Sequence, residues 1–141
     1  MMSEQALAAY ARFYETLSPH TLDGLRNLVA PQVRFKDPFN DVRGVDALLR
    51  ATRAMFRFGT PRFEIIDRTL SARAGYLLWR YTVDAAAERP WIIDGMTELR
   101  FDAEDRVIEH IDHWDAAGQV YEKVPLLGAL LRLAKRRLHA K

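Results

Sequence analysis

The stretch Ile93–Asp115 decides the fold, and it reads IDGMTELRFDAEDRVIEHIDHWD. Its middle, Asp102–Asp105, is a polar segment between two runs in which apolar and polar side chains alternate. Turn residues between two alternating runs are a β-hairpin signal. We therefore predict two antiparallel strands, over 91–101 and 106–114, joined by a short polar turn.

One face of this predicted hairpin carries an unusual mixture of side chains. Successive side chains of a strand point to opposite faces, so alternate residues share a face. The shared sets are Gly95, Thr97, Leu99 and Phe101 on the first strand, and Ile108, His110, Asp112 and Trp114 on the second. Buried polar groups without partners cost about 1–3 kcal/mol each, so a His and an Asp beside apolar residues predict a pocket wall. The alternative is a polar network that only fixes the sheet.

Outward from the hairpin, helices come first in the chain and strands follow. Helical spacing of apolar residues predicts helices over 4–17, from residue 21 to Pro31, and over 45–57, with Ser3 as the first cap. Alternating runs predict a short strand over 33–37 and long strands over 62–72, 76–84, 91–101 and 106–114. This order indicates an α+β domain with helices packed on one face of a curved, mostly antiparallel sheet.

Length and composition fit one soluble domain. A chain of 141 residues with 49% hydrophobic and 28% charged residues is ordinary for a globular protein. The chain has no cysteine, which excludes disulfides and thiol nucleophiles. The N-terminus lacks the basic and apolar regions of a signal peptide, so we expect a cytoplasmic protein.

Positive charge is concentrated at the C-terminal end. All 19 acidic residues but only fifteen of the 21 basic ones lie within residues 1–122, which makes that part net −4 and residues 123–141 net +6. The basic pI therefore predicts no nucleic-acid-binding surface on the domain. We divide the chain into a domain over 1–115 and an extension over 116–141, with Asp115 as the cap of a short helix over 116–123.

The extension ends in a basic amphipathic helix over 126–139, by its helically spaced leucines. We expect this helix to pack on the domain or on a partner subunit. The alternative is a helix that lies on a membrane surface, because basic amphipathic helices also bind there.

The order of elements and two stretches of sequence resemble the nuclear transport factor 2-like superfamily, which includes ketosteroid isomerases and SnoaL-type polyketide cyclases. The stretches are LDGLRNLVAPQVRFKDPFNDVRG, Leu22–Gly44, and GMTELRFDAEDRVIEHIDHWD, Gly95–Asp115. The resemblance covers about residues 5–115 and implies a cone-shaped α+β fold and a homodimer formed through the outer face of the sheet. Because this fold hosts many unrelated activities, the resemblance alone does not fix a function.

The resemblance also implies site residues. Asp37 matches the general-base aspartate of ketosteroid isomerases. Phe13 stands where their catalytic tyrosine lies, with Tyr14 about 100° further around the helix. Thr97 stands where their oxyanion hole has a protonated aspartate. Both donors of that oxyanion hole are replaced, so the sequence departs from the pattern needed to stabilise an enolate in the same way.

Asp112 matches the acid/base position that SnoaL-type cyclases keep on their last long strand. The resemblance implies that His110, Asp112 and Trp114 point toward the interior. By comparison of positions with the same family, Arg80 is expected to point inward as well. A His–Asp pair on one face suits acid/base catalysis, because histidine exchanges protons near neutral pH. An inward Arg80 would neutralise Asp112 or Asp37.

The expected site has Asp37, His110 and Asp112 as catalytic residues. The expected ligand contacts come from Phe13, Tyr14, Phe56, Arg80, Thr97 and Trp114. The ligand is expected to be a small hydrophobic molecule. Two functions stay open: a proton-transfer enzyme of isomerase, cyclase or dehydratase type, and a non-catalytic ligand-binding or protein-interaction module. We expect no cofactor, because no phosphate loop or dinucleotide motif is present, and no metal, because alternation sends His113 away from His110.

Overall fold

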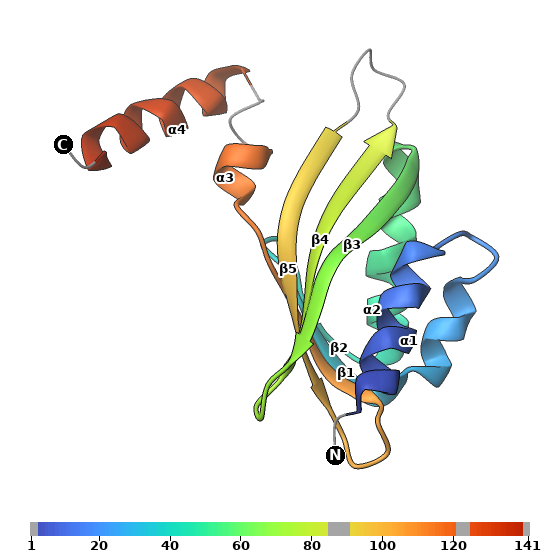
Figure 1. Cartoon of the computed structure of the whole chain (residues 1–141). Helices are drawn as coiled ribbons and strands as arrows, with labels where there is room; N and C mark the ends of the chain where they lie inside the picture. Colours follow the sequence, from blue (N-terminus) through green and yellow to red (C-terminus); the bar gives the residue numbers. More distant parts are fainter. Residues whose placement is uncertain (1–2, 85–90, 121–124, 140–141) are drawn as a thin grey trace.

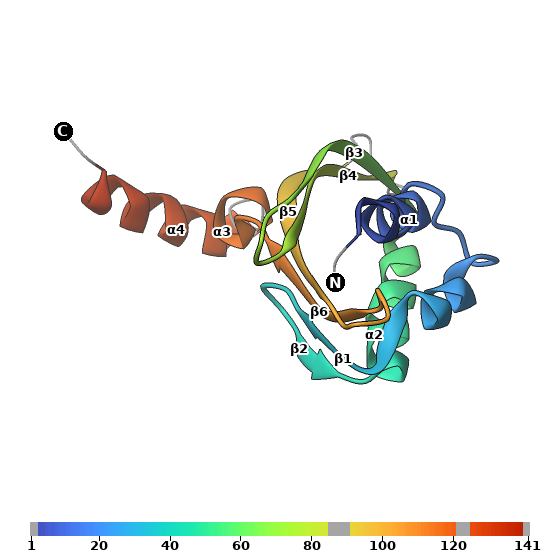
Figure 2. The same cartoon turned by 60° about the horizontal axis from the view of Figure 1, so that its bottom comes forward.

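Six strands form one open sheet that bends around the N-terminal helix (Figures 1 and 2). The computed structural model describes residues 3–84, 91–120 and 125–139. In chain order the strands are β1 (Val29–Lys36), β2 (Asp41–Arg43), β3 (Thr60–Leu70), β4 (Gly75–Asp84), β5 (Trp91–Phe101) and β6 (Val107–His113). Their order in the sheet is β2-β1-β6-β5-β4-β3, and only the β1–β6 pair is parallel. The predicted α+β class and the predicted antiparallel meander are confirmed.

Two of the helices, α1 (Glu4–Glu15) and α2 (Val45–Ala54), cover the concave side of this sheet. The other helices in the described ranges are the 3₁₀ helix η1 (Leu22–Asn27), the 3₁₀ helix η2 (Met55–Phe58), α3 (Ala116–Gln119) and α4 (Pro125–Leu138). Figure 2 shows α1 inside the bend of the sheet, with α2 beside β1. Ser3 caps α1 by accepting a hydrogen bond from the Ala6 amide at 3.0 Å, as predicted. Asp115 caps α3 in the same way, through the Gly118 amide at 2.9 Å.

The core lies between α1, α2 and the sheet. Leu7, Leu25, Leu48 and Leu99 are fully buried there, and each buried leucine contributes about 1.5–3 kcal/mol. Gly75 at the start of β4 lies so close to α1 that an added Cβ would be 3.0 Å from Leu7 Cδ1. The absence of a side chain at this position lets the helix pack directly on the sheet.

Pro31 was predicted to end the second helix, but it lies inside β1. The helix is a short 3₁₀ turn that ends at Asn27. The pairing of β1 with β6 shifts register between Val29 and Arg34. Proline has no N–H to donate and is tolerated in strands at such irregular places, which is why it fits in a strand with neighbours on both sides.

Three further boundaries differ from the prediction. The helix predicted over 45–57 changes at Met55 from α2 to the 3₁₀ helix η2. Residues 41–43, for which no strand was predicted, form β2 because they pair with the end of β1. The helix predicted over 116–123 is α3, which ends at Gln119, and residues 121–123 lie outside the described ranges.

α4 extends away from the sheet (Figures 1 and 2). Its residues Leu130, Leu133 and Leu138 are 59%, 48% and 85% exposed. These leucines do not pack on the described part of the domain, so the expectation of packing on the domain is wrong, and packing on a partner subunit stays a prediction. The concave side is filled by α1, α2 and aromatic side chains, and the cavity inside it measures only about 20 Å³. No helix in the described ranges has the length and apolarity to span a bilayer.

Candidate functional site

The hairpin of β5 and β6 brings the predicted polar residues together on its inner face. The register places Thr97 opposite Asp112 and Leu99 opposite His110. Thr97 and His110 are each only 3% exposed, whereas the His113 side chain is 59% exposed and contacts Glu98 on the outer face. The predicted face assignment for this hairpin is confirmed.

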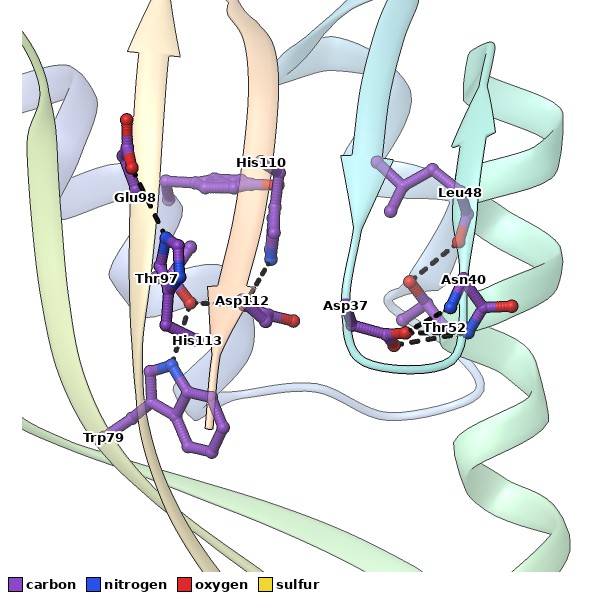
Figure 3. A network of polar contacts seen from close by, with 11 residues as sticks. Asp37, Asn40, Leu48, Thr52, Trp79, Thr97, Glu98, His110, Asp112 and His113 are labelled. Atoms are coloured by element: carbon purple, nitrogen blue, oxygen red, sulfur yellow. Dashed lines mark hydrogen bonds and ion pairs between the residues drawn. The ribbon is translucent and has the colours of Figure 1, made fainter. Parts of the chain in front are cut away.

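A continuous line of hydrogen bonds crosses the interior from β4 to α1. The indole Nε1–H of Trp79 donates to Thr97 Oγ1 at 2.8 Å, and Thr97 donates in turn to Asp112 Oδ1 at 2.6 Å. The same Asp112 oxygen lies 2.8 Å from His110 Nε2. His110 Nδ1 lies 2.8 Å from the hydroxyl of Tyr10. Figure 3 shows the part of this line from Trp79 to His110.

The partners of His110 determine its tautomer. A carboxylate can only accept, so the hydrogen bond between His110 and Asp112 places a proton on Nε2. In the tautomer with the proton on Nε2 alone, Nδ1 accepts from the Tyr10 hydroxyl. Every group in the line then has a partner, which is what a buried polar network needs for stability.

Burial holds the tyrosines next to His110 in the protonated form. Desolvation raises the pKa of Tyr10 well above its ordinary value, with the neighbouring Tyr14 as a second cause. Desolvation also raises the pKa of Tyr14, which lies near the hydroxyls of Tyr10 and Thr52. The rings of Tyr10, Tyr14 and Phe35 surround the His110 imidazole edge-on, with centroids 5.7, 5.7 and 5.1 Å away. His110 is thus enclosed by aromatic rings and kept from solvent.

A small cavity adjoins this line of hydrogen bonds. It is lined by Tyr14, Phe63, Ile65, Leu77, Trp79, Thr97, His110 and Asp112. Its volume of about 20 Å³ corresponds to about one water molecule. Asp112 reaches it with an 18% exposed side chain, and no described residue makes a hydrogen bond to its second oxygen, Oδ2. That oxygen is available to a molecule entering the cavity.

Gly95 makes room for the indole of Trp79. The two residues are directly paired across β4 and β5. A Cβ at residue 95 would lie 2.6 Å from two atoms of the Trp79 ring, which is far inside van der Waals contact. The absence of a side chain here lets the ring lie flat over β5 and aim its N–H at Thr97.

Asp37 was predicted to share the site with His110 and Asp112, but its carboxylate is used in the turn between β1 and β2. Its Oδ1 accepts from the amides of Phe39 and Asn40 at 2.8 and 2.7 Å, and the Asn40 side chain contacts both oxygens. Figure 3 shows Asp37 facing Asn40 at the end of the strand. The predicted common cavity is therefore wrong for Asp37, because an aspartate before a proline can satisfy the turn amides.

Arg80 was predicted to face the interior and lies on the outer face. It is paired across the strands with Asp94, and its Nε donates to Asp94 Oδ1 at 2.8 Å. The inward side chains of β4 are instead Leu77, Trp79 and Val83, all at most 5% exposed. The sequence correctly showed which β4 side chains share a face, but the set containing Arg80 was wrongly placed inside. The pairing register of β4 with β5 decides which set points inward, and that register cannot be read from the sequence.

The remaining predicted ligand contacts divide between cavity and core. Tyr14 and Thr97 line the cavity. Phe13 is 8% exposed in the core, with its ring 5.2 Å from that of Tyr14, and is not a cavity residue. Phe56 lies partly buried in η2 and does not line the cavity either. Trp114 packs at the edge of the core, with its ring centroid 5.4 Å from that of Phe39.

A family comparison identifies the domain. Residues 10–110 match the model of the SnoaL-like domain, which is more than half of the chain. The chain belongs to the SnoaL-like domain family. No curated protein sequence matches it.

Solved structures share the fold of this SnoaL-like domain at low sequence identity. A putative SnoaL-like polyketide cyclase from Jannaschia sp. CCS1 is 13% identical, with a TM-score of 0.71, over 83% of this chain and 90% of that one. A protein with a ketosteroid isomerase-like fold from Catenulispora acidiphila, in complex with trimethylamine, is 15% identical, with a TM-score of 0.69, over 89% and 95%. An NTF2-like protein from Exiguobacterium sp. 255-15 is 16% identical, with a TM-score of 0.67, over 78% and 98%. These likenesses confirm the cone-shaped fold.

Sequence reasoning missed two residues of the hydrogen-bonded line in this SnoaL-like domain. Neither Tyr10 nor Trp79 was among the predicted site residues. Both carry a polar group at the end of an apolar ring, and such groups usually find a partner when buried. That signal favours a search for partners, but it does not say that the partners are His110 and Thr97.

Within the described ranges, no three metal-ligating side chains cluster. The hydrogen-bonded line from Trp79 to Tyr10 contains one carboxylate, that of Asp112, which can accept a proton and release it again. Asp112 Oδ1 is held by Thr97 and His110, and no described residue makes a hydrogen bond to Oδ2. Neighbouring groups in good geometry of this kind are what general acid–base catalysis requires.

Proposed function

We propose that this SnoaL-like domain is a proton-transfer enzyme for a small, mainly apolar molecule, of isomerase, cyclase or dehydratase type, with Asp112 as the base. The supporting observation is the geometry of its carboxylate. Oδ1 is held by Thr97 at 2.6 Å and by His110 at 2.8 Å, while Oδ2 has no partner among the described residues. A base oriented in advance in this way loses little freedom when the substrate binds.

His110 and Tyr10 act as positioning residues in this proposal. His110 orients the carboxylate through Nε2–H, and Tyr10 keeps the imidazole in that tautomer through Nδ1. The proton that Asp112 accepts returns to the substrate at another atom, so the reaction needs only the protein's own side chains. Asp37 is not the base in this scheme, because its carboxylate serves the β1–β2 turn.

The size of the cavity limits the substrate or requires movement. A volume of about 20 Å³ accepts one water molecule and not a polycyclic compound. Binding of a larger molecule requires rotation of the aromatic rings that line the cavity, among them Tyr14 and Phe63. A small enolisable carbonyl compound, admitted to Asp112 when these rings rotate, is the substrate class that fits best.

Hydrogen–deuterium exchange into substrate tests the proposed function. A panel of enolisable ketones and polyketide-like compounds is incubated in D₂O with the protein, and deuterium at the acidic carbon is followed by NMR. We expect Asp112→Asn to lower the exchange rate of an accepted compound by about 10²–10⁴-fold, with the fold kept. Asp37→Asn is the matched control and retains exchange. Equal rates for the wild type and Asp112→Asn would exclude this base.

The small cavity favours a second function, a non-catalytic binding or interaction module. The interior leaves little room for a ligand. In this second function the hydrogen-bonded line only stabilises the sheet, and a ligand or partner binds elsewhere on the domain. In that case no compound exchanges faster than in buffer, and Asp112→Asn changes stability but not ligand binding, as measured by thermal shift with the same panel.

We also propose that a second copy of the chain binds the outer face of the sheet, as the resemblance to the superfamily implies. Leu78 and Met96, paired across β4 and β5, are 39% and 41% exposed there, and Ile66 on β3 is 53% exposed. Sedimentation velocity of the wild type and of Leu78→Lys/Met96→Lys tests this. A dimer in the wild type and a monomer in the variant is the expected result, and a monomeric wild type would contradict it.

A further inference from the structure

α4 carries an apolar face with basic residues on the side opposite to it. At 100° per residue, Leu127, Leu130, Leu131, Leu133 and Leu138 fall within an arc of about 160°, which Arg137 interrupts near one edge. The opposite side holds Arg132, Lys135 and Arg136, and residues 125–138 contain no acidic residue. An apolar face with basic residues opposite it is the pattern of helices that lie in the surface layer of a membrane.

The apolar face of α4 is exposed. Leu127, Leu130, Leu133 and Leu138 are 39%, 59%, 48% and 85% exposed, and both views show the helix extending beyond α3 and away from the sheet (Figures 1 and 2). Contiguous exposed leucines of this kind mark an interaction site more often than an inert surface. The question is which partner offers both an apolar layer and negative charge.

Acidic side chains on the outer face of the sheet are already paired with arginines. On the outer face of the sheet, Asp94 is paired with Arg80 at 2.8 Å. Glu98 and Glu109 lie 4.0 and 3.6 Å from Arg100.

We propose that α4 is an arm that docks this domain on an anionic lipid surface. The leucines enter the boundary between headgroups and acyl chains, and the basic side chains contact the negatively charged headgroups. The domain, whose residues 1–122 carry net −4, then faces away from the surface. This proposal is independent of the function proposed for the cavity.

Vesicle binding by the full-length protein tests the proposal. Phosphatidylcholine vesicles with and without phosphatidylserine are compared by co-sedimentation at low and high salt. We expect binding only with phosphatidylserine, weakened by salt because exposed charges are screened. Arg136→Gln/Arg137→Gln should weaken binding by about 25-fold, since each basic residue contributes roughly fivefold. Leu130→Gln/Leu133→Gln should weaken it by at least about tenfold.

Matched variants on the domain control for charge and hydrophobicity. Arg53→Gln/Arg57→Gln removes two exposed positive charges from α2 and η2, and Phe39→Gln removes one exposed apolar side chain from the β1–β2 turn. These controls should bind as the wild type does. The proposal is overturned if the wild type does not bind anionic vesicles, or if the controls lose as much binding as the α4 variants. It is also overturned if the wild type forms a dimer that does not bind vesicles and Leu130→Gln/Leu133→Gln dissociates that dimer.

Discussion

Tyr10 on α1 and His110 on β6 are joined by a hydrogen bond of 2.8 Å between the phenol oxygen and Nδ1, across one hundred residues of sequence. Both side chains are buried, at 1% and 3% exposure. The bond therefore links the first helix to the last strand inside the core. It also determines which nitrogen of His110 faces Asp112.

The first prediction concerns this bond. Tyr10→Phe leaves a buried acceptor at Nδ1 unpaired, so the free energy of unfolding should fall by about 1–3 kcal/mol. Urea unfolding followed by circular dichroism measures the change. Tyr76→Phe removes the same oxygen from a half-buried site on β4 where no described residue bonds to it, and should change stability by less than about 0.5 kcal/mol. Equal losses in both variants would show that the bond contributes nothing.

Gly95→Ala should displace the indole of Trp79. The new Cβ would meet the ring at 2.6 Å, and forced repacking of a core typically costs about 1–3 kcal/mol. Near-ultraviolet circular dichroism should change with the loss of stability, because the environment of a buried tryptophan changes. Gly24→Ala is the matched control, since its Cβ would lie 3.9 Å from Phe13, an ordinary contact. A Gly95→Ala protein as stable as the control would contradict the packing described here.

Stability should decline at alkaline pH because of Tyr14 and Tyr10, whose pKa values are raised by burial. In the unfolded chain these phenols lose a proton near pH ~10, whereas the folded protein keeps both protons. Above that pH the unfolded state binds fewer protons, so the free energy of unfolding falls by about 1.4 kcal/mol per pH unit for each group. Tyr14→Phe should reduce this slope by one such contribution, measured by urea unfolding at several alkaline pH values. Identical slopes in variant and wild type would refute the assignment.

Deletion of residues 125–141 should leave the melting temperature within about 2 °C of the wild type. The reason is that the α4 leucines are exposed and contribute little to the core. Differential scanning calorimetry measures the change. Leu7→Ala, at a fully buried position, is the comparison and should lose about 2–5 kcal/mol. A large drop on deletion would mean that α4 packs on the domain or on a partner in solution.

The sequence by itself determined the local structure and one face of the site. Ser3 and Asp115 act as caps, as their residue types predict, because a cap needs only a side-chain oxygen and the next few amides. The period of two in 91–101 and 106–114 placed Thr97, His110 and Asp112 together, and the family resemblance turned them inward. Local chemistry and alternation are properties of short stretches, and they can be read without knowledge of the rest of the chain.

Only the tertiary structure decided which distant residues meet. The register of β4 against β5 sent Arg80 outward to Asp94 and Trp79 inward to Thr97, although alternation allows either face. The packing of α1 inside the bend of the sheet brought Tyr10 to His110, and turn formation kept Asp37 at the β1–β2 end. A shift of one residue in register exchanges every inward side chain for an outward one. The composition of the site therefore depends on long-range pairing that no local pattern contains.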